Sequence, residues 1–175
     1  MGIPSYFSYV VRNHPSIVKK YIKNSLKVDN LYLDCNSIIY DTYHKMDCHI
    51  VTDDYSSNII KNVIIKIEEY INIIKPSKTV FIAFDGVAPV AKLEQQRSRR
   101  YKSWYQNHIS KIILKNQKDD PWNTVSITPG TKFMSELNHK VSEHFSKNSL
   151  NNIKSIIVSG SNKVGEGEHK LFERL

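Results

Sequence analysis

The chain has 175 residues, of which 40% are hydrophobic and 24% are charged. This balance is typical of a globular domain with a sizeable core, and it excludes collagen-like, low-complexity and wholly disordered proteins. An excess of 25 Lys and Arg over 17 Asp and Glu gives a formal net charge of +8, which favours polyanionic partners such as nucleic acids.

The N-terminal half alternates predicted helices with one short strand. Helices are expected near residues 5–12 and 16–23, followed by a β-prone strand over residues 30–34. The strand ends in an acid, and a helix capped near Asn36 or Ser37 should follow it. In residues 56–75, Ile and Val recur at three- and four-residue steps, which predicts a helix with one apolar face that Pro76 ends.

The second half repeats this pattern. Residues 79–85 are nearly all apolar and close on an acid, as in a buried parallel strand. A long polar helix over residues 90–115, a loop with two acids at 119–120, a turn at 128–130 and a helix over 132–145 should follow. A last strand over residues 155–159 leads into an acidic stretch and a final helix. This order predicts an α/β fold with a mainly parallel sheet and helices on both faces.

Two cysteines, Cys35 and Cys48, are too few for a disulfide framework. They predict a protein of a reducing compartment, which we expect to be the cytoplasm, with the nucleus left open. The most apolar region, residues 59–74, is interrupted by Lys, Glu and Asn side chains, so no membrane span is predicted.

Acidic residues follow all three predicted strands. In an open α/β sheet the functional crevice lies outside the carboxyl ends of the strands, which is where Asp34, Asp85, Glu166 and Glu168 would meet. Each acid alone could simply cap a turn. Together, clustered carboxylates repel one another unless a cation neutralises them, which indicates a site for Mg²⁺ or Mn²⁺. His169, beside two of these acids, is expected at the surface or behind the ligands rather than among them.

Residues 91–102 carry five Lys or Arg and one Glu. On a helix, four of the polar residues share one face with donors suited to phosphate oxygens, while Arg97 and Lys102 point elsewhere; the four are Lys92, Gln96, Arg99 and Arg100. Such a run can also be a solvated helix face. Because it begins a few residues after Asp85, it indicates metal-assisted hydrolysis of a phosphodiester whose end the basic face holds.

These residues resemble the 5′→3′ exoribonucleases of the Xrn type, which are distant relatives of flap endonucleases and other PIN-like nucleases. The resemblance covers essentially the whole chain. It is carried, in order, by Met1-Gly-Ile-Pro4, Asn30-Leu-Tyr-Leu-Asp-Cys-Asn-Ser-Ile38, Phe84-Asp-Gly-Val-Ala-Pro89, Ala91-Lys-Leu-Glu-Gln-Gln-Arg-Ser-Arg-Arg100, Ile127-Thr-Pro-Gly-Thr131 and Gly165-Glu-Gly-Glu-His-Lys170.

The resemblance implies roles for the residues singled out above. It places the four acids in a catalytic metal site, with two Mg²⁺ or Mn²⁺ ions in the complete enzyme, and the four basic-helix residues in a pocket for the 5′-monophosphate of single-stranded RNA. A closed basic pocket would exclude a cap or triphosphate, and a 5′-hydroxyl would leave its cations unpaired. Where the family often has a histidine that stacks on the terminal base, this chain has Tyr40.

The family pattern continues past residue 175 with a strand carrying an Asp-x-Asp pair that completes the metal site. Residues 1–175 are therefore expected to be the N-terminal portion of an exoribonuclease catalytic domain, truncated before that segment. Two alternatives stay open at this point. The chain could bind RNA 5′ ends as an inactive fragment or decoy, or it could be a flap-type DNA nuclease, which shares the acidic site.

Overall fold

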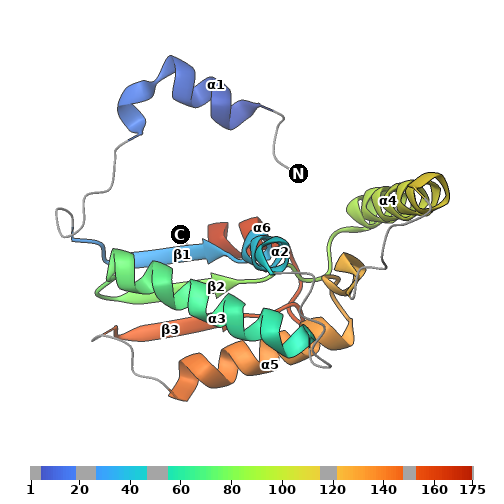
Figure 1. The fold of residues 1–175 in the computed structure, drawn as a ribbon. Helices are drawn as coiled ribbons and strands as arrows, with labels where there is room; N and C mark the ends of the chain where they lie inside the picture. The colour runs from blue at the N-terminus through green and yellow to red at the C-terminus, as the bar shows by residue number, and fades with distance from the viewer. Residues whose placement is uncertain (1–4, 19–26, 47–54, 115–121, 148–152, 175) are drawn as a thin grey trace.

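The computed structural model describes residues 5–18, 27–46, 55–114, 122–147 and 153–174. Its centre is a three-stranded parallel sheet in the order β1 (Asn30–Asp34), β2 (Thr79–Ala83) and β3 (Ser155–Ser159). The strands are in simple register, so the last residues, Asp34, Ala83 and Ser159, lie side by side. All three strands point the same way in Figure 1, and their carboxyl ends form one edge of the sheet.

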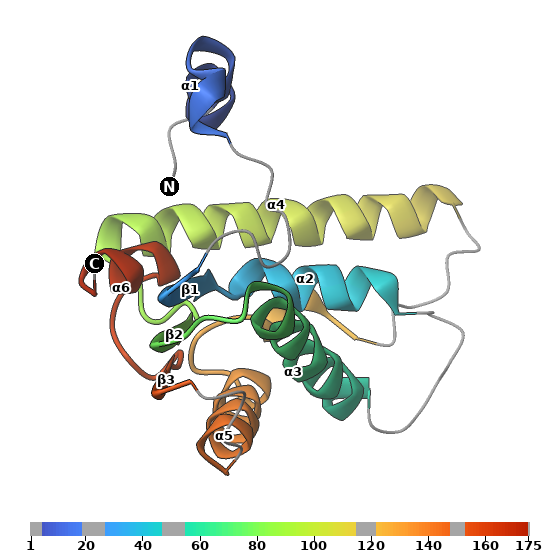
Figure 2. The same ribbon diagram turned by 90° about the vertical axis from the view of Figure 1, so that its left-hand side faces the viewer.

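Helices cover both faces of this sheet, as the sequence predicts for an α/β fold. The helices are α1 (Tyr6–Asn13), α2 (Asn36–Lys45), α3 (Tyr55–Ile74), α4 (Val90–Leu114), α5 (Lys132–Lys147) and α6 (Gly167–Phe172), with 3₁₀ turns η1 (Pro15–Ile17) and η2 (Thr124–Ser126). Figure 2 shows α3 and α5 on one side of the sheet and α6 on the other. Helix α4 lies beyond the carboxyl ends of the strands and runs across them (Figures 1 and 2).

The main core lies between the sheet and the apolar face of α3. The three- and four-residue spacing that predicts this helix places Val63, Ile67 and Ile71 inward, where each is fully buried. They meet Val80 and Ile82 of β2, which are also fully buried. Burial of both faces of β2 explains its almost continuous apolar sequence.

Most predicted elements agree with the structure to within two residues. Two differences concern the ends of elements near the carboxyl edge. The N-cap of α2 is Cys35, which makes no side-chain cap bond, and not Asn36 or Ser37. Asn36 does not cap the helix because its side chain is bonded to Asp85. Strand β2 ends at Ala83 rather than at residue 85, because the Asp85 N–H donates to the Asn36 side chain and leaves the ladder.

The remaining predictions are partly covered by the described residues. Of the helix expected near residues 16–23, the described part is the 3₁₀ turn η1. The turn at 128–130 is confirmed, with Gly130 at a φ of 89° that favours glycine. The acids at 119–120 and Cys48 lie outside the described residues.

Cys35 is fully buried and forms no disulfide. Burial raises the pKa of its thiol, since the thiolate is disfavoured away from water. Across the described ranges, no helix has both the length and the apolar character needed to cross a membrane.

Candidate active site

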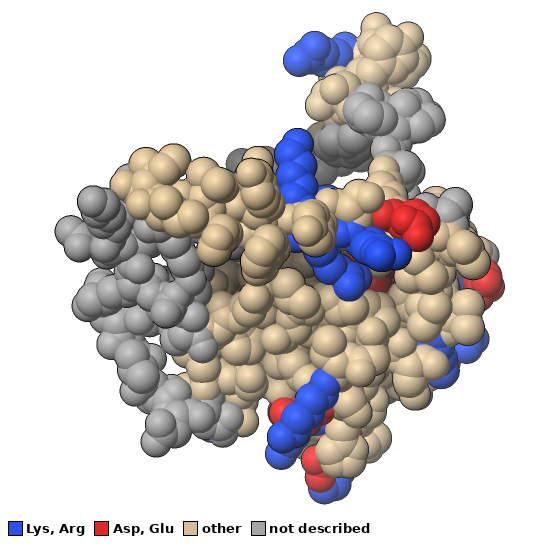
Figure 3. All heavy atoms as spheres, turned by 90° about the vertical axis from the view of Figure 1, so that its right-hand side faces the viewer, with Lys and Arg blue, Asp and Glu red and all other residues tan. Residues whose placement is uncertain are grey.

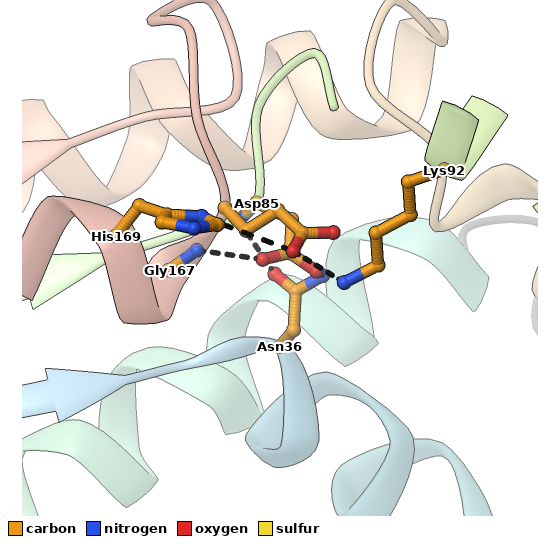
Figure 4. A network of polar contacts seen from close by, with 6 residues as sticks. Asn36, Asp85, Lys92, Gly167 and His169 are labelled. Atoms are coloured by element: carbon orange, nitrogen blue, oxygen red, sulfur yellow. Dashed lines mark hydrogen bonds and ion pairs between the residues drawn. The ribbon is translucent and has the colours of Figure 1, made fainter. Parts of the chain in front are cut away.

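The carboxyl ends of β1 and β2 are joined by a pair of hydrogen bonds between Asn36 and Asp85 (Figure 4). Asn36 Nδ2 donates to Asp85 Oδ2 at 2.7 Å, and the Asp85 backbone N–H donates to Asn36 Oδ1 at 3.0 Å. The Cys35 N–H also donates to the Ala83 carbonyl at 2.9 Å. Asp85 is therefore held at the strand ends by the first turn of α2.

The segment before α6 is joined to the segment after β2 in a similar way. The Gly86 N–H donates to the Gly165 carbonyl at 2.8 Å, and the Gly165 N–H donates to the Val87 carbonyl at 3.1 Å. A Cβ at Gly86 would lie 1.7 Å from the Lys163 carbonyl oxygen, so only glycine permits this approach. The pairing brings the acidic stretch to Asp85, whose Oδ1 accepts a hydrogen bond from the Gly167 N–H at 2.8 Å.

Asp34 completes the approach of the acids. A Cβ atom added to Gly167 would lie only 2.5 Å from Asp34 Oδ1. The Asp34 carboxylate therefore packs directly against the backbone of α6. Loss of water at this contact raises the pKa of Asp34, and the charges of Asp85, Glu168 and Glu166 raise it further, although the Asn36 N–H opposes them. Predicted carboxylates that are far apart in the sequence therefore lie at one end of the sheet.

Glu166 and Glu168 differ in their surroundings. Glu166 is buried, and its carboxylate forms an ion pair with the Lys92 ammonium of α4. Glu168 lies in the first turn of α6 and is exposed. His169 is mostly exposed, with Nδ1 at 3.9 Å from Glu166 Oε2, as expected for a residue beside the acids.

Lys92 joins the acidic cluster to the basic helix. Partial burial opposes its charge, but the hydrogen bond and the charge of Glu166 raise the pKa of Lys92 overall. Lys92 is therefore a stable cation between the two groups of predicted site residues.

The other predicted phosphate ligands follow Lys92 along α4. Gln96 and Arg100 are half-buried, and Arg100 Nη2 donates to Gln96 Oε1 at 3.4 Å. Arg99 is exposed, and Arg97, on another side of the helix, lies 3.7 Å from Glu94. Figure 3, which faces the carboxyl ends of the strands, shows Lys and Arg gathered over the N-terminal half of α4.

Tyr40, the predicted stacking residue, lies on α2 and is 37% exposed. It is one helical turn after Asn36, so both residues share the same side of α2. Its ring is accessible to a ligand, and its role stays a prediction.

Sequence reasoning gave no role to Lys170, which the structure places beneath the site. Its side chain is almost fully buried, and Nζ donates to the carbonyls of Phe84 at 2.7 Å and Gly160 at 2.9 Å. Burial lowers the pKa of Lys170. Lysine is usually exposed, so only the free carbonyls at two strand ends, which depend on the fold, could have indicated this position.

The chemistry of the acidic cluster fits a hard divalent cation. Its side-chain donors are carboxylate oxygens, which such ions prefer, and the pKa of Asp34 is raised by desolvation and by the charges of the neighbouring acids. Within the described ranges, however, no three His, Cys, Asp or Glu side chains converge closely enough to hold an ion. Asp34 and Glu168 are exposed, and Asp85 is half-buried. The four metal ligands stay a prediction.

Comparison with known proteins gives one matching family and several curated relatives. The family described as XRN 5'-3' exonuclease N-terminus matches residues 1–175. The 5'-3' exoribonuclease 1 of Saccharomyces cerevisiae is 34% identical over 183 residues, which cover 98% of this chain and 12% of that protein. The human 5'-3' exoribonuclease 1 is 35% identical over 187 residues, which cover 99% of this chain and 11% of that protein.

A relative of a second kind is the 5'-3' exoribonuclease 2 homolog of Drosophila melanogaster. It is 28% identical over 215 residues, which cover 99% of this chain and 23% of that protein. The chain thus spans between about a tenth and a quarter of the length of these relatives.

Proposed function

The chain belongs to the XRN 5'-3' exonuclease N-terminus family, and from this premise we propose that it is the N-terminal part of a 5′→3′ exoribonuclease that acts on 5′-monophosphorylated single-stranded RNA. The observation that carries the proposal is the meeting of the acidic strand ends with the basic face of α4 through Lys92 and Glu166. One group of residues suits a terminal phosphate, and the other lies beside it, where the next phosphodiester would be cut.

In the proposed reaction, Lys92, Gln96, Arg99 and Arg100 bind the 5′-phosphate and set the position of the RNA. Lys92 exchanges its partner Glu166 for the phosphate, so that the Glu166 carboxylate is no longer bound to this ammonium when it acts with the other acids. Asp34, Asp85, Glu166 and Glu168 would hold Mg²⁺ or Mn²⁺, two ions in the complete enzyme, to activate water and stabilise the leaving oxygen. Tyr40 offers its ring to the terminal base.

The test compares RNAs that differ only at the 5′ end. From the complete polypeptide that contains residues 1–175, we expect nucleotide release from 5′-monophosphate RNA with Mg²⁺ or Mn²⁺, none with EDTA, and slower release from 5′-hydroxyl and 5′-triphosphate RNA. Asp85→Ala should abolish cutting while RNA binding remains. Arg100→Ala should mainly remove the preference for the monophosphate, and Lys102→Ala, on another side of α4, is the matched control. Equal rates on 5′-hydroxyl RNA would contradict the pocket.

A second candidate is RNA 5′-end binding without cutting. The absence of a closed carboxylate site among the described residues favours it. It predicts salt-sensitive binding of RNA and no released nucleotide at any Mg²⁺ or Mn²⁺ concentration. Competition by DNA of the same sequence tests the flap-type alternative in the same assay.

We propose the cytoplasm as the site of action, which the buried Cys35 thiol supports because it forms no disulfide.

A further inference from the structure

Asn36 is an uncharged side chain that contacts an acid of the site (Figure 4). It lies at the start of α2, and from the sequence alone it suits a helix cap. We propose that Asn36 is a positioning residue that fixes the orientation of the Asp85 carboxylate for a divalent cation. This inference rests on the proposed function, because it assigns Asp85 to the cation site.

The geometry holds both oxygens of Asp85. Asn36 Nδ2 donates to Oδ2 at 2.7 Å, and the Gly167 N–H donates to Oδ1 at 2.8 Å. The Asp85 N–H returns a hydrogen bond to Asn36 Oδ1 at 3.0 Å, so the two residues are joined at two points. Two donors, one to each oxygen, fix the plane of the carboxylate and leave a further lone pair on each oxygen for a cation.

The charge of the partner matters as much as the geometry. Glu166 is paired with the ammonium of Lys92, which neutralises it until the lysine moves. Asn36 and the Gly167 N–H are neutral donors that orient the Asp85 carboxylate, and the nearby ammonium groups of Lys92 and Lys170 also attract it. Asp85 is therefore an acid of this cluster whose orientation is fixed before substrate arrives.

The chain contains a matched contact at the end of β3. Asn138 Nδ2 donates to Ser161 Oγ at 2.7 Å, and the Ser161 N–H donates to Asn138 Oδ1 at 3.1 Å. This pair also joins a helix to a strand end at two points, but it ends on a hydroxyl instead of a carboxylate. Loss of either asparagine should therefore have a similar effect on folding, and only loss of Asn36 should affect a cation.

The experiment uses the complete polypeptide that contains residues 1–175 and measures Mn²⁺ affinity by electron paramagnetic resonance, thermal unfolding, and kcat and KM on 5′-monophosphate RNA. Asn36→Ala should weaken Mn²⁺ binding about 10- to 100-fold and lower kcat similarly, as loss of a residue supporting a metal ligand does, while KM for RNA stays unchanged. Asn36→Gln, which keeps the C=O and NH₂ groups of the side-chain amide on a longer stem, should recover part of the Mn²⁺ affinity. Asn138→Ala should lower the melting temperature as much as Asn36→Ala and leave Mn²⁺ affinity unchanged.

Two results would overturn the inference while the proposed function stands. One is native Mn²⁺ affinity in folded Asn36→Ala, and the other is an equal loss of affinity in the control variant Asn138→Ala. If the complete native polypeptide neither binds Mn²⁺ nor releases nucleotides, the proposed function fails instead, and the inference fails with it.

Discussion

At the scale of single residues, Asp34 and Asp29 are two carboxylates close in sequence with opposite electrostatic surroundings. Asp34 lies against Gly167 among other acids, which raises its pKa above the ordinary value of 3.8. Asp29 accepts hydrogen bonds from Lys78 and Ser77, which lower its pKa. The ionised Asp34 carboxylate therefore lowers the stability of the folded chain, as expected for a residue that serves binding. The ionised Asp29 carboxylate stabilises the folded chain.

Asp34→Asn should stabilise the cation-free protein in a manner that depends on pH. Because the folded pKa is raised, the folded chain holds this proton more tightly than the unfolded chain, and stability falls as pH rises from about 3.8 through the folded pKa. Below 3.8 the variant and the native chain should melt alike. Above the folded pKa the variant should melt at a higher temperature than the native chain, as measured by circular dichroism in EDTA.

Asp29→Asn is the control with the opposite sign. Its lowered pKa contributes stability above the ordinary value of 3.8 that is lost as pH falls through the folded pKa. The variant should therefore melt below the native chain at neutral pH. A lower melting temperature for Asp34→Asn at about pH 7 in EDTA would show that the acids do not repel one another in the folded state.

At the scale of elements, the helices and strands were largely predictable, and the contacts between them were not. The apolar spacing of residues 56–75 and the continuous apolar run before Asp85 depend only on local sequence, and α3 and β2 follow them closely. Asp34 ends β1 and Asp85 follows β2 by two residues, as predicted, whereas Glu166 and Glu168 lie at the start of α6, and the role of these acids as ligands stays a prediction. Asn36 and Lys170 were missed because their partners are a carboxylate and two carbonyls that only the folded sheet brings near them.

The core face of α3 gives a prediction about this element. Ile67 is fully buried against the sheet, whereas Ile65 on the same helix is 51% exposed. Ile67→Ala should lower the free energy of unfolding by about 3 kcal/mol, through lost burial and the cavity that remains. Ile65→Ala should change it by less than about 0.5 kcal/mol. Urea unfolding measures both, and similar losses in the two variants would contradict the placement of α3.

At the scale of the whole molecule, one group of Lys and Arg side chains lies on the N-terminal half of α4, beside the candidate site. Lys92 is already paired with Glu166 in the free protein, so exchange of Glu166 for a phosphate should add little to the salt dependence of binding. Arg99 is exposed, and the described partner of Arg100 is the neutral Gln96. Counterions of the terminal phosphate should therefore be released mainly by contact with these two guanidinium groups.

This arrangement predicts how salt changes the preference for a 5′-monophosphate. With two guanidinium groups on the terminal phosphate, the dependence of log K on log salt should be steeper for 5′-monophosphate RNA than for 5′-hydroxyl RNA by about 1.4. The preference should then fall about 7-fold between roughly 50 and 200 mM salt, as measured by fluorescence anisotropy in EDTA.

Arg99→Ala should halve the difference between the two slopes, because one of the two cations is gone. Lys102→Ala should leave it unchanged, since that side chain lies on another side of α4. Equal slopes for the two RNAs would mean that the basic face of α4 does not bind the terminal phosphate, even if the chain binds RNA elsewhere.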